Sequence, residues 1–407
     1  MTNPTLTARG RLLFTAIIVI LFAALAEAFS FVVIKIISPR LGQPILRTSA
    51  IFHDQSVRIQ RMLDHSDSLF MVFDAALGWR FRPGYRSDLY TIGMNGLRGT
   101  REYTTLPAPG VLRADAFGDS FVFGGEVNDS VAWPAIVERE FSKIEVPNYG
   151  VGAYGSDQTF LSVVASGREL HPQVVIVGWV PDDLRRNVNV YRRFLSTDEQ
   201  PLVKPRFVLS PTGALTLVPT PLSGAEPFRQ FLERPRDVVT MGRQDSWYTP
   251  LIYRDPLYDY SATVRLATTG WLWASRRYWG SNRLYVGGVI NPHAEAFRLQ
   301  VALFDRTADS IRQQGSEPLF VLFPDREQLG RVLRGTPLAY QPLLDTLRAH
   351  GLNPLDASQA FVGAAGSDVD RFFMVAHYSP TANHLVARWI GRILEEKRSA
   401  LRAQRGR

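Results

Sequence analysis

Residues 116–120 read Ala-Phe-Gly-Asp-Ser and end an apolar run that begins at Val111. Such a run predicts a buried strand, and the Gly-Asp-Ser at its end predicts a sharp turn into a helix. Further on, Asn148-Tyr149-Gly150 opens a glycine-rich turn, and His377 begins a His-Tyr-Ser-Pro stretch ahead of the last predicted helix. A serine and a histidine brought together with backbone donors are the parts of a nucleophilic serine site.

Strands and helices alternate on both sides of this stretch. The predicted strands are 111–117, 144–147, 173–180, 318–323 and 353–355, and the predicted helices are 132–141, 156–170, 294–314, 340–350 and 381–398. This alternation predicts an α/β fold, a three-layer sandwich with a central parallel sheet. Ligand sites in such sheets lie beyond the carboxyl ends of the strands, where Ser120, Gly150 and Asp182 fall.

Taken together, these blocks resemble the SGNH (GDSL-type) hydrolase superfamily, whose fold is flavodoxin-like. The segments 73–84 (Phe-Asp-Ala-Ala-Leu-Gly-Trp-Arg-Phe-Arg-Pro-Gly) and 95–99 (Asn-Gly-Leu-Arg-Gly) resemble the extension that precedes the core in a bacterial, membrane-anchored branch of that superfamily. The resemblance covers about residues 73–185 and 290–395. The pre-core extension is expected to cover the core.

The resemblance implies a role for three residues. Ser120 would be the nucleophile, with its own backbone N–H as one oxyanion donor, and His377 would be the general base. A second backbone donor would come from Ala153, which stands where the family's glycine-rich turn ends in glycine. An alanine keeps the N–H but lacks the conformational freedom of glycine.

Two expected helpers are absent from their usual places. Asp182 stands where the family has an asparagine, and an ionised carboxylate cannot donate to an oxyanion, so only a protonated Asp182 could serve. Met374 and Val375 occupy the positions before His377 where the family has the orienting aspartate. A remote carboxylate, Asp370 first and otherwise Asp368 or Asp356, is the candidate to replace it.

The N-terminal segment predicts a membrane anchor. From Leu12 to Ile34 the chain is apolar except for Thr15, Glu27 and Ser30, and about 20 such residues in a helix cross a bilayer. Two arginines and no acidic residue precede it, which favours a cytoplasmic tail over residues 1–11, a span over 12–37 and a periplasmic main domain in the bacterial inner membrane. A cleaved signal peptide is the alternative, since small residues at 24–28 offer cleavage spacing. Glu27 is costly in hydrocarbon and is expected near the outer interface or paired with a partner helix.

The rest of the chain divides around the core. We expect a polar helical stalk over 38–70, the two parts of the core over 71–186 and 291–396, an insertion over 187–290, and a basic tail over 397–407. The insertion should contain a hairpin around Pro211-Thr212-Gly213. It also holds four of the eight tryptophans, among ten aromatic residues between 247 and 285. These predict either a core of the insertion's own or a surface for sugars or integral-membrane partners, with the core weighted about two to one.

Composition narrows the function classes. The 407 residues contain no cysteine, which excludes disulfides and thiolate metal sites, and the net charge of +8 is partly local to the basic tail. No phosphate-loop or dinucleotide pattern occurs, and the seven histidines, including His384, lack metal-ligand spacing. We therefore expect no cofactor, no metal and no nucleic-acid partner.

Two functional hypotheses follow. In the first, the protein is an extracytoplasmic serine esterase or acyl-transfer enzyme that acts on O-acyl groups of envelope glycans or lipids through Ser120 and His377. In the second, it is a catalytically inactive domain that serves as a structural or binding subunit of a membrane protein complex. The missing oxyanion amide and triad acid favour the second hypothesis, and retention of the serine and histidine favours the first.

Overall fold

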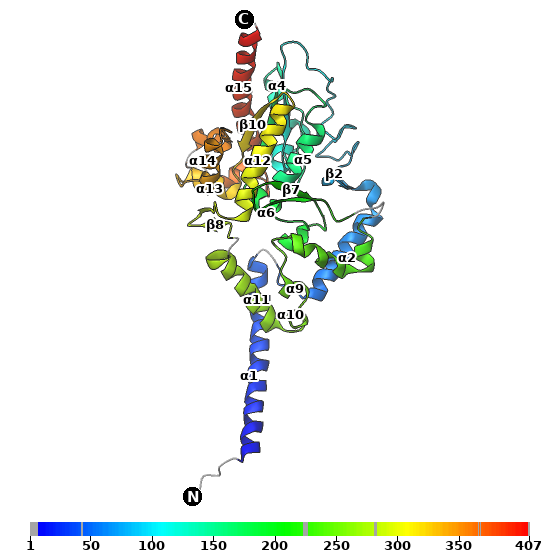
Figure 1. The fold of residues 1–407 in the computed structure, drawn as a ribbon, viewed down its shortest axis with the longest axis vertical. Coiled ribbons are helices and arrows are strands. Elements are labelled where there is room, and N and C mark those ends of the chain that lie inside the picture. The colour runs from blue at the N-terminus through cyan, green and yellow to red at the C-terminus, as the bar shows by residue number, and fades with distance from the viewer. Residues whose placement is uncertain are drawn as a thin grey trace.

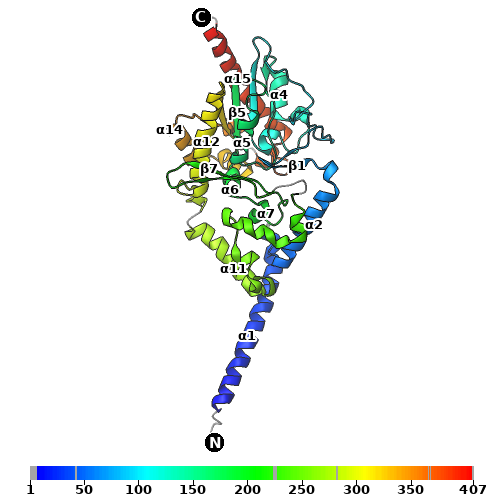
Figure 2. The same cartoon turned by 45° about the vertical axis from the view of Figure 1, so that its right-hand side comes forward.

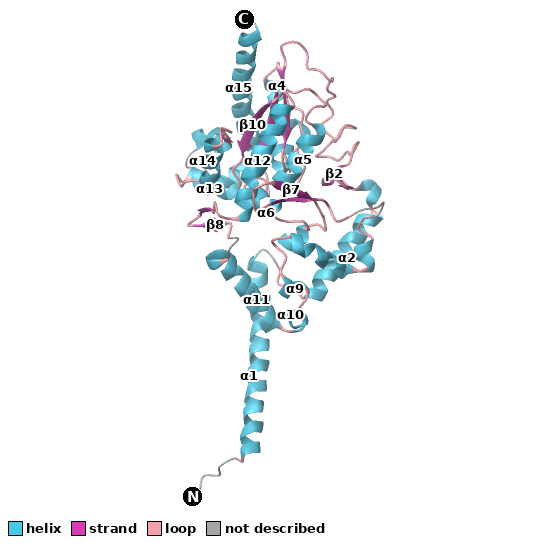
Figure 3. Cartoon of the chain, in the orientation of Figure 1, coloured by secondary structure: helices cyan, strands magenta, loops and turns pink. Residues whose placement is uncertain are grey.

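The computed structural model describes residues 7–41, 44–222, 227–280, 283–364, 366 and 368–405. The molecule is elongated, with a long N-terminal helix at one end and the C-terminal helix at the other (Figure 1). Between them lie two bodies. We call them the α/β lobe, residues 71–186 and 291–405, and the insertion lobe, residues 44–70 and 187–290. The α/β lobe combines the central strands with helices around them, whereas the insertion lobe is mostly helical (Figure 3).

The α/β lobe is built on one parallel sheet of five strands. These are β3 (Leu112–Phe117), β4 (Ile144–Glu145), β5 (Val174–Trp179), β10 (Glu317–Leu322) and β11 (Leu355–Asp356), in the spatial order β11-β10-β5-β3-β4. The first strand along the chain therefore lies between the second and the third, which is the doubly wound, flavodoxin-like order. All five predicted strands are found, with ends shifted by at most two residues.

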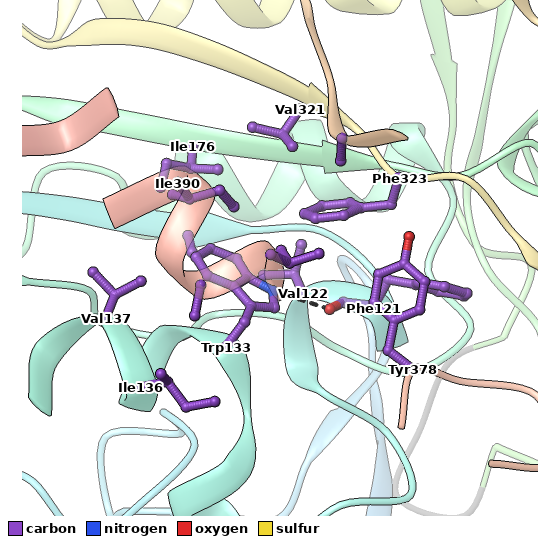
Figure 4. Packing of buried hydrophobic residues seen from close by; sticks show 14 of the residues in the cluster. Phe121, Val122, Trp133, Ile136, Val137, Ile176, Val321, Phe323, Tyr378 and Ile390 are labelled. Atoms are coloured by element: carbon purple, nitrogen blue, oxygen red, sulfur yellow. Dashed lines mark hydrogen bonds between the residues drawn. The ribbon is translucent and has the colours of Figure 1, made fainter. Parts of the chain in front are cut away.

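Helices cover both faces of this sheet. One face carries α4 (Trp133–Glu140), α13 (Arg326–Leu333) and α15 (Pro380–Arg405), and the other carries α5 (Ser156–Ser166), α12 (Glu295–Gln313) and α14 (Gln341–Ala349). Trp133 and Ile390 pack against Ile176 and Val321 of the sheet on the first face (Figure 4). The predicted three-layer sandwich is confirmed.

The pre-core extension lies over the loop that follows Ser120. It contains the antiparallel pair β1 (Met71–Asp74) and β2 (Gly78–Phe81). Phe81 stacks on Phe70 and tilts onto Phe123, with ring centroids 4.3 Å and 4.6 Å apart. This aromatic packing buries the back of the short helix α3 (Ser120–Phe123), so the extension supports the site as well as covering the core.

The insertion lobe has a core of its own, and the helix of the predicted stalk belongs to it. In α2 (Thr48–Asp64), Ile51 and Ile59 are buried against residues 190–253, so α2 does not stand free as a stalk. Apolar side chains on one helix face need such a partner. The predicted hairpin is present as β6 (Arg206–Leu209) and β7 (Leu215–Val218).

Shorter elements complete the chain. The helices are α6 (Asp183–Asn187), α7 (Arg192–Leu195), α8 (Gln230–Glu233), α9 (Pro250–Tyr253), α10 (Pro256–Tyr260) and α11 (Ala262–Ala274), and α11 is continued by a π-helical turn, η5 (Ser275–Trp279). The 3₁₀ turns are η1 (Ser38–Leu41), η2 (Ser66–Ser68), η3 (Asp129–Val131), η4 (Pro235–Gln244), η6 (Ala357–Ala364) and η7 (Val369–Phe372). The remaining strands, β8 (Tyr285–Val286) and β9 (Val289–Ile290), form an antiparallel pair.

The aromatic stretch of the insertion divides between core and surface. Tyr253 and Tyr258 are buried, as a core predicts, whereas Trp271, Trp273 and Trp279 are more than half exposed. The exposed members lie on α11 and on the turn η5 that follows it.

The N-terminal helix α1 (Ala8–Ile37) is long and apolar enough to cross a membrane, and it projects from the rest of the molecule (Figures 1 and 2). Its apolar side chains are exposed along most of its length. The part of α1 around Glu27 packs against α11. Glu27 accepts hydrogen bonds from the Ser261 hydroxyl (2.7 Å), the Thr263 N–H (3.1 Å) and the Ala262 N–H. A carboxylate is favoured at a helix N-terminus, so α11 is the partner helix for Glu27.

Candidate active site

Ser120 lies at the turn between β3 and α3, on the carboxyl edge of the sheet. The Asp119 side chain caps α3 by accepting the Phe121 N–H at 2.8 Å, so it stabilises the turn. Gly150 of the glycine-rich turn approaches α3 so closely that a Cβ there would lie 2.3 Å from the Phe123 nitrogen. The Asn148 side chain donates to the carbonyls of Val122 and Phe123. These contacts fix the helix that presents the serine.

The structure brings Ser120 and His377 together. The serine Oγ lies 2.8 Å from Nε2 of the imidazole, although the two residues are 257 positions apart in the chain. The ring rests on Gly125, where a Cβ would meet its Cγ at 2.9 Å, and on Phe121, whose ring centroid is 5.4 Å away. The hydroxyl and the base are therefore within proton-transfer distance.

Glu126 lies on the other side of the imidazole. Its Oε1 is 3.0 Å from Nδ1 of His377, although the Nδ1–H is not aligned with that oxygen as a full hydrogen bond. Such alignments often tighten when substrate binds. A carboxylate facing Nδ1 favours the tautomer with its proton there and leaves Nε2 free to accept the serine proton. The arrangement is thus Ser120, His377, Glu126.

The same carboxylate holds the backbone around His377. It accepts N–H groups from Val375 (2.8 Å), Ala376 (3.1 Å) and His377 itself (3.3 Å). Burial opposes ionisation of Glu126, but the contact with His377 and the N–H groups of Ala376 and His377 outweigh it and lower its pKa. Glu126 is therefore an ionised acceptor that orients both the ring and its loop.

Arg98 of the pre-core extension fixes the loop that carries Glu126. Its guanidinium donates to the carbonyls of Phe123, Gly124 and Val127 and pairs with Asp129 at 3.0 Å, while its side chain is only 2 % exposed. Glu126 has φ 67°, a left-handed conformation that is costly for a residue other than glycine. The surrounding hydrogen bonds hold this conformation in place.

Two backbone donors remain free near the serine. Within the described residues, neither the Ser120 N–H nor the Ala153 N–H donates to a protein acceptor. Ala153 has φ 65°, so it adopts the conformation that a glycine would favour, at a cost of about 1–2 kcal/mol. The role of both groups as oxyanion donors stays a prediction.

Asp182 does not have the protonated state that an oxyanion donor would need. Burial would raise its pKa, but the charges of Arg186 and Arg185 outweigh burial and lower it. Its oxygens lie 3.0 Å and 3.4 Å from those two guanidinium groups. Asp182 is therefore ionised, and the prediction that it could donate is wrong; its negative charge is compensated by the two arginines.

Asp370 does not orient the histidine either. It pairs with Arg326, on an exposed part of η7, and its side chain is 69 % exposed. Arg326 also donates to the carbonyls of Met374 and Val375, so this pair supports the histidine loop from outside. Asp356 bonds to Tyr340 and Ser358, and Asp368 caps η7. The place predicted for Asp370 is occupied by Glu126.

Ser120 and His377 lie at the carboxyl edge of the sheet, and this edge faces the insertion lobe. α15 begins three residues after His377 and ends at the pole of the molecule farthest from α1 (Figures 1 and 2). α12 begins at the same edge, where its Glu295 pairs with Arg206 of β6 in the insertion, the two side chains 2.5 Å apart. A separate cavity of about 1260 Å³ lies within and beneath the insertion lobe, and neither Ser120 nor His377 lines it.

No group of metal-ligating side chains is found in the part of the chain that the structure describes. His384 faces Glu140 on the surface of α15, with Nδ1 3.4 Å from Oε1, and its side chain is 47 % exposed.

Comparison with known proteins gives neighbours only at the level of structure. No protein-family model matches this chain, and no curated protein matches it. It is similar to a lipolytic protein of the G-D-S-L family from Desulfitobacterium hafniense DCB-2, at 12 % identity and a TM-score of 0.32 over 69 % of this chain and 98 % of that one. It is also similar to a member of the lipolytic protein G-D-S-L family from Veillonella parvula DSM 2008, at 8 % identity and a TM-score of 0.31 over 68 % and 94 %. These names agree with the resemblance noted in the sequence. Scores this low carry no information about chemistry.

Proposed function

We propose that this protein is a membrane-anchored serine esterase or acyl-transfer enzyme with Ser120, His377 and Glu126 as its triad. The observation that carries the proposal is the pair of distances at the imidazole, 2.8 Å to the serine oxygen and 3.0 Å to the glutamate oxygen. The acid missing from its usual position before the histidine is supplied from the loop that follows the nucleophile.

The chemistry follows from this arrangement. The Ser120 oxygen attacks the carbonyl carbon of an ester while Nε2 of His377 takes its proton, and the Ser120 and Ala153 N–H groups donate to the oxyanion. The C–O bond to the alcohol then breaks, and the imidazolium returns the proton to the departing oxygen. Water, or an acceptor hydroxyl, attacks the acyl-serine in the second half and regenerates the enzyme.

The substrate class is an O-acyl ester of an envelope glycan or lipid. Support comes from the anchor helix and from the place of the site at the carboxyl edge of the sheet, which faces the insertion lobe and α1 (Figure 1). The loop before His377 carries the exposed apolar side chains of Met374 and Val375, which suit contact with an acyl chain. In this proposal α1 is a single span with a cytoplasmic N-terminus, and the main domain is extracytoplasmic.

One observation favours the alternative, an inactive subunit of a membrane complex. Asp182 stands where the family has a side-chain amide donor, and its ionised carboxylate cannot donate. Loss of one oxyanion donor costs roughly 10²- to 10³-fold in turnover. Arg185 and Arg186 compensate the charge of Asp182 and so reduce its repulsion of an oxyanion. The contacts of the described residues identify no other side-chain donor in place of the amide. We therefore expect slow turnover.

The deciding experiment uses the full chain in mild detergent. Hydrolysis of p-nitrophenyl acetate, butyrate and octanoate is measured together with labelling by a fluorophosphonate probe, which reports an activated serine even when turnover is slow. Wild type should hydrolyse at least one ester and be labelled, and Ser120→Ala should do neither. Absence of both signals from folded wild-type protein would favour the inactive-subunit hypothesis.

A further inference from the structure

The cavity of about 1260 Å³ has a lining of two kinds. Part of the lining is apolar, with Ile37 at the end of α1 and Leu266, Leu272 and Trp273 of α11. Another part is cationic. Its volume of about 1260 Å³ exceeds the roughly 300–1,000 Å³ of ordinary small-molecule sites, so a larger amphiphile fits it better than a compact polar molecule.

The cationic side is not neutralised by the protein. Five arginines line the cavity, and two of them are paired: Arg185 with Asp182 and Arg193 with Asp54. Among the described lining residues, the only carboxylate is Glu295, which is bound by Arg206. The other three cations, Arg276, Arg277 and Arg283, form no ion pair with any carboxylate of the described residues.

Arg276 is held in place without a countercharge. Its guanidinium lies 4.9 Å from the ring centre of Trp247, and that of Arg185 lies 5.2 Å from the same ring. Arg276 is an exposed residue. Its charge lies beside that of Arg185 on one indole, and an anion bound there would lower the repulsion that Asp182 does not already offset.

The height of the cavity relative to a bilayer follows from α1. A hydrocarbon core of about 30 Å corresponds to about 20 helical residues, which from Leu12 reaches Phe31. Glu27 and the start of α11 that it caps then lie about 6 Å inside this boundary, four residues at 1.5 Å each.

The neighbouring surface agrees with such immersion. Leu257 and Tyr260 of α10 are 62 % and 79 % exposed, and Trp271 and Trp273 of α11 are 58 % exposed each. Tryptophan and tyrosine collect where hydrocarbon meets headgroups. Ile37, six residues beyond Phe31, therefore places the cavity at the level of the headgroups.

We propose that this cavity binds one anionic phospholipid of the adjacent leaflet, with its phosphate on Arg276 and Arg277 and an acyl chain along α11. Arginine suits a phosphate because its planar group donates two parallel hydrogen bonds. The apolar wall and the position beside the bilayer select a lipid over a soluble phosphate. The proposal does not depend on catalysis at Ser120.

The test is native mass spectrometry of the full chain released from nanodiscs of equal phosphatidylglycerol and phosphatidylcholine. Wild type should retain one phosphatidylglycerol. Arg276→Gln/Arg277→Gln should reduce that occupancy about tenfold, because the charge-assisted bonds are lost. Gly270→Phe should reduce it independently by filling the cavity: Gly270 lines it, an added Cβ meets no atom within 4 Å, and a helix tolerates the change.

The matched control is Arg236→Gln. Arg236 also lies over an aromatic ring of the insertion lobe, that of Phe52, but does not line the cavity. Equal retention of the two lipids by wild type would overturn the proposal, as would equal losses in Arg236→Gln and the double variant. Unchanged retention in both cavity variants would do the same. Ser120→Ala should retain lipid like wild type, so failure of the esterase proposal would leave this result unaffected.

Discussion

Replacing Glu126 by glutamine tests the catalytic proposal at its most specific point. Glutamine has the same size, and its amide oxygen can still accept the backbone N–H groups of the histidine loop, so the fold should persist. Its NH₂ group, however, cannot accept from Nδ1 of His377 and would favour the tautomer with the proton on Nε2. That tautomer cannot take the proton of Ser120.

The expected loss can be estimated from the environment of the carboxylate. Removing a triad acid costs about 10⁴-fold when the acid is buried. The Glu126 side chain is 27 % exposed, so water partly replaces it, and we expect a fall in kcat of about 10³-fold, or roughly 4 kcal/mol.

The assay is kcat/KM for the best p-nitrophenyl ester, with thermal unfolding of each variant measured alongside. Asp370→Asn is the control, because Asp370 pairs with Arg326 and is remote from the imidazole contacts. It should stay within about threefold of wild type. If Glu126→Gln also stays within that range while Ser120→Ala is inactive, Glu126 is not the triad acid.

Four further outcomes are expected. Arg98→Gln leaves the carbonyls of Gly124 and Val127 without a side-chain donor, while the Phe123 carbonyl keeps Asn148. The change should destabilise the protein by about 2–4 kcal/mol in denaturant unfolding, with activity lost as the Glu126 loop moves; an unchanged midpoint would contradict this. Gly125→Ala puts a methyl group about 3 Å from the His377 ring and should lower kcat at least 10²-fold with little change in stability, so full activity would exclude the observed ring position. Contacts with the charged form lower the pKa of Glu126 in the folded protein. The contribution of Glu126 to stability is therefore complete above the ordinary carboxyl pKa of about 4.3 and is lost as the pH falls through the lower pKa of the folded state. The difference in Tm between wild type and Glu126→Gln should shrink below about pH 4. Glu27→Leu removes the acceptor of the Ala262 and Thr263 N–H groups, although Ser261 still caps α11, and should expose that helix to limited proteolysis in nanodiscs; unaltered cleavage would show that the Glu27 contact is dispensable.

The α/β fold could be predicted from sequence because its signals are local. Apolar runs such as 111–117 and 318–323 stand between helical segments, and their alternation leaves few topologies open. Ser120 and His377 could be found for a similar reason, since each lies in a short block of recognisable sequence. Their contact, across 257 positions, follows once the sheet order is fixed.

Glu126 could not be found in this way. It is six residues after the nucleophile, in a loop whose path depends on Arg98 and on a left-handed backbone that sequence does not disclose. The signal that was available is Gly124-Gly125 before it, which indicates a tight turn close to the serine. Nothing in the chain order shows that this turn meets the histidine loop.

Charge pairing and burial account for the remaining differences. Asp182 is ionised because Arg186 follows it by one helical turn, a spacing visible in the sequence whose effect depends on the guanidinium folding back. The aromatic stretch gave two alternatives: burial of Tyr253 fits a core of the insertion's own, Trp271 is exposed, and a surface for sugars or partners stays a prediction. The spacing of aromatic residues in a sequence does not by itself show which rings are buried and which are exposed.

The bond between Glu27 and the start of α11 has a mechanical consequence. A domain carried on a flexible tether samples many heights and orientations over a bilayer, whereas this one is clamped to its own anchor by a capped helix. In the proposed enzyme, Ser120 would therefore work at one fixed distance from the lipid surface. Only esters that reach that plane would be cleaved, so the anchor would set the choice of substrate by reach.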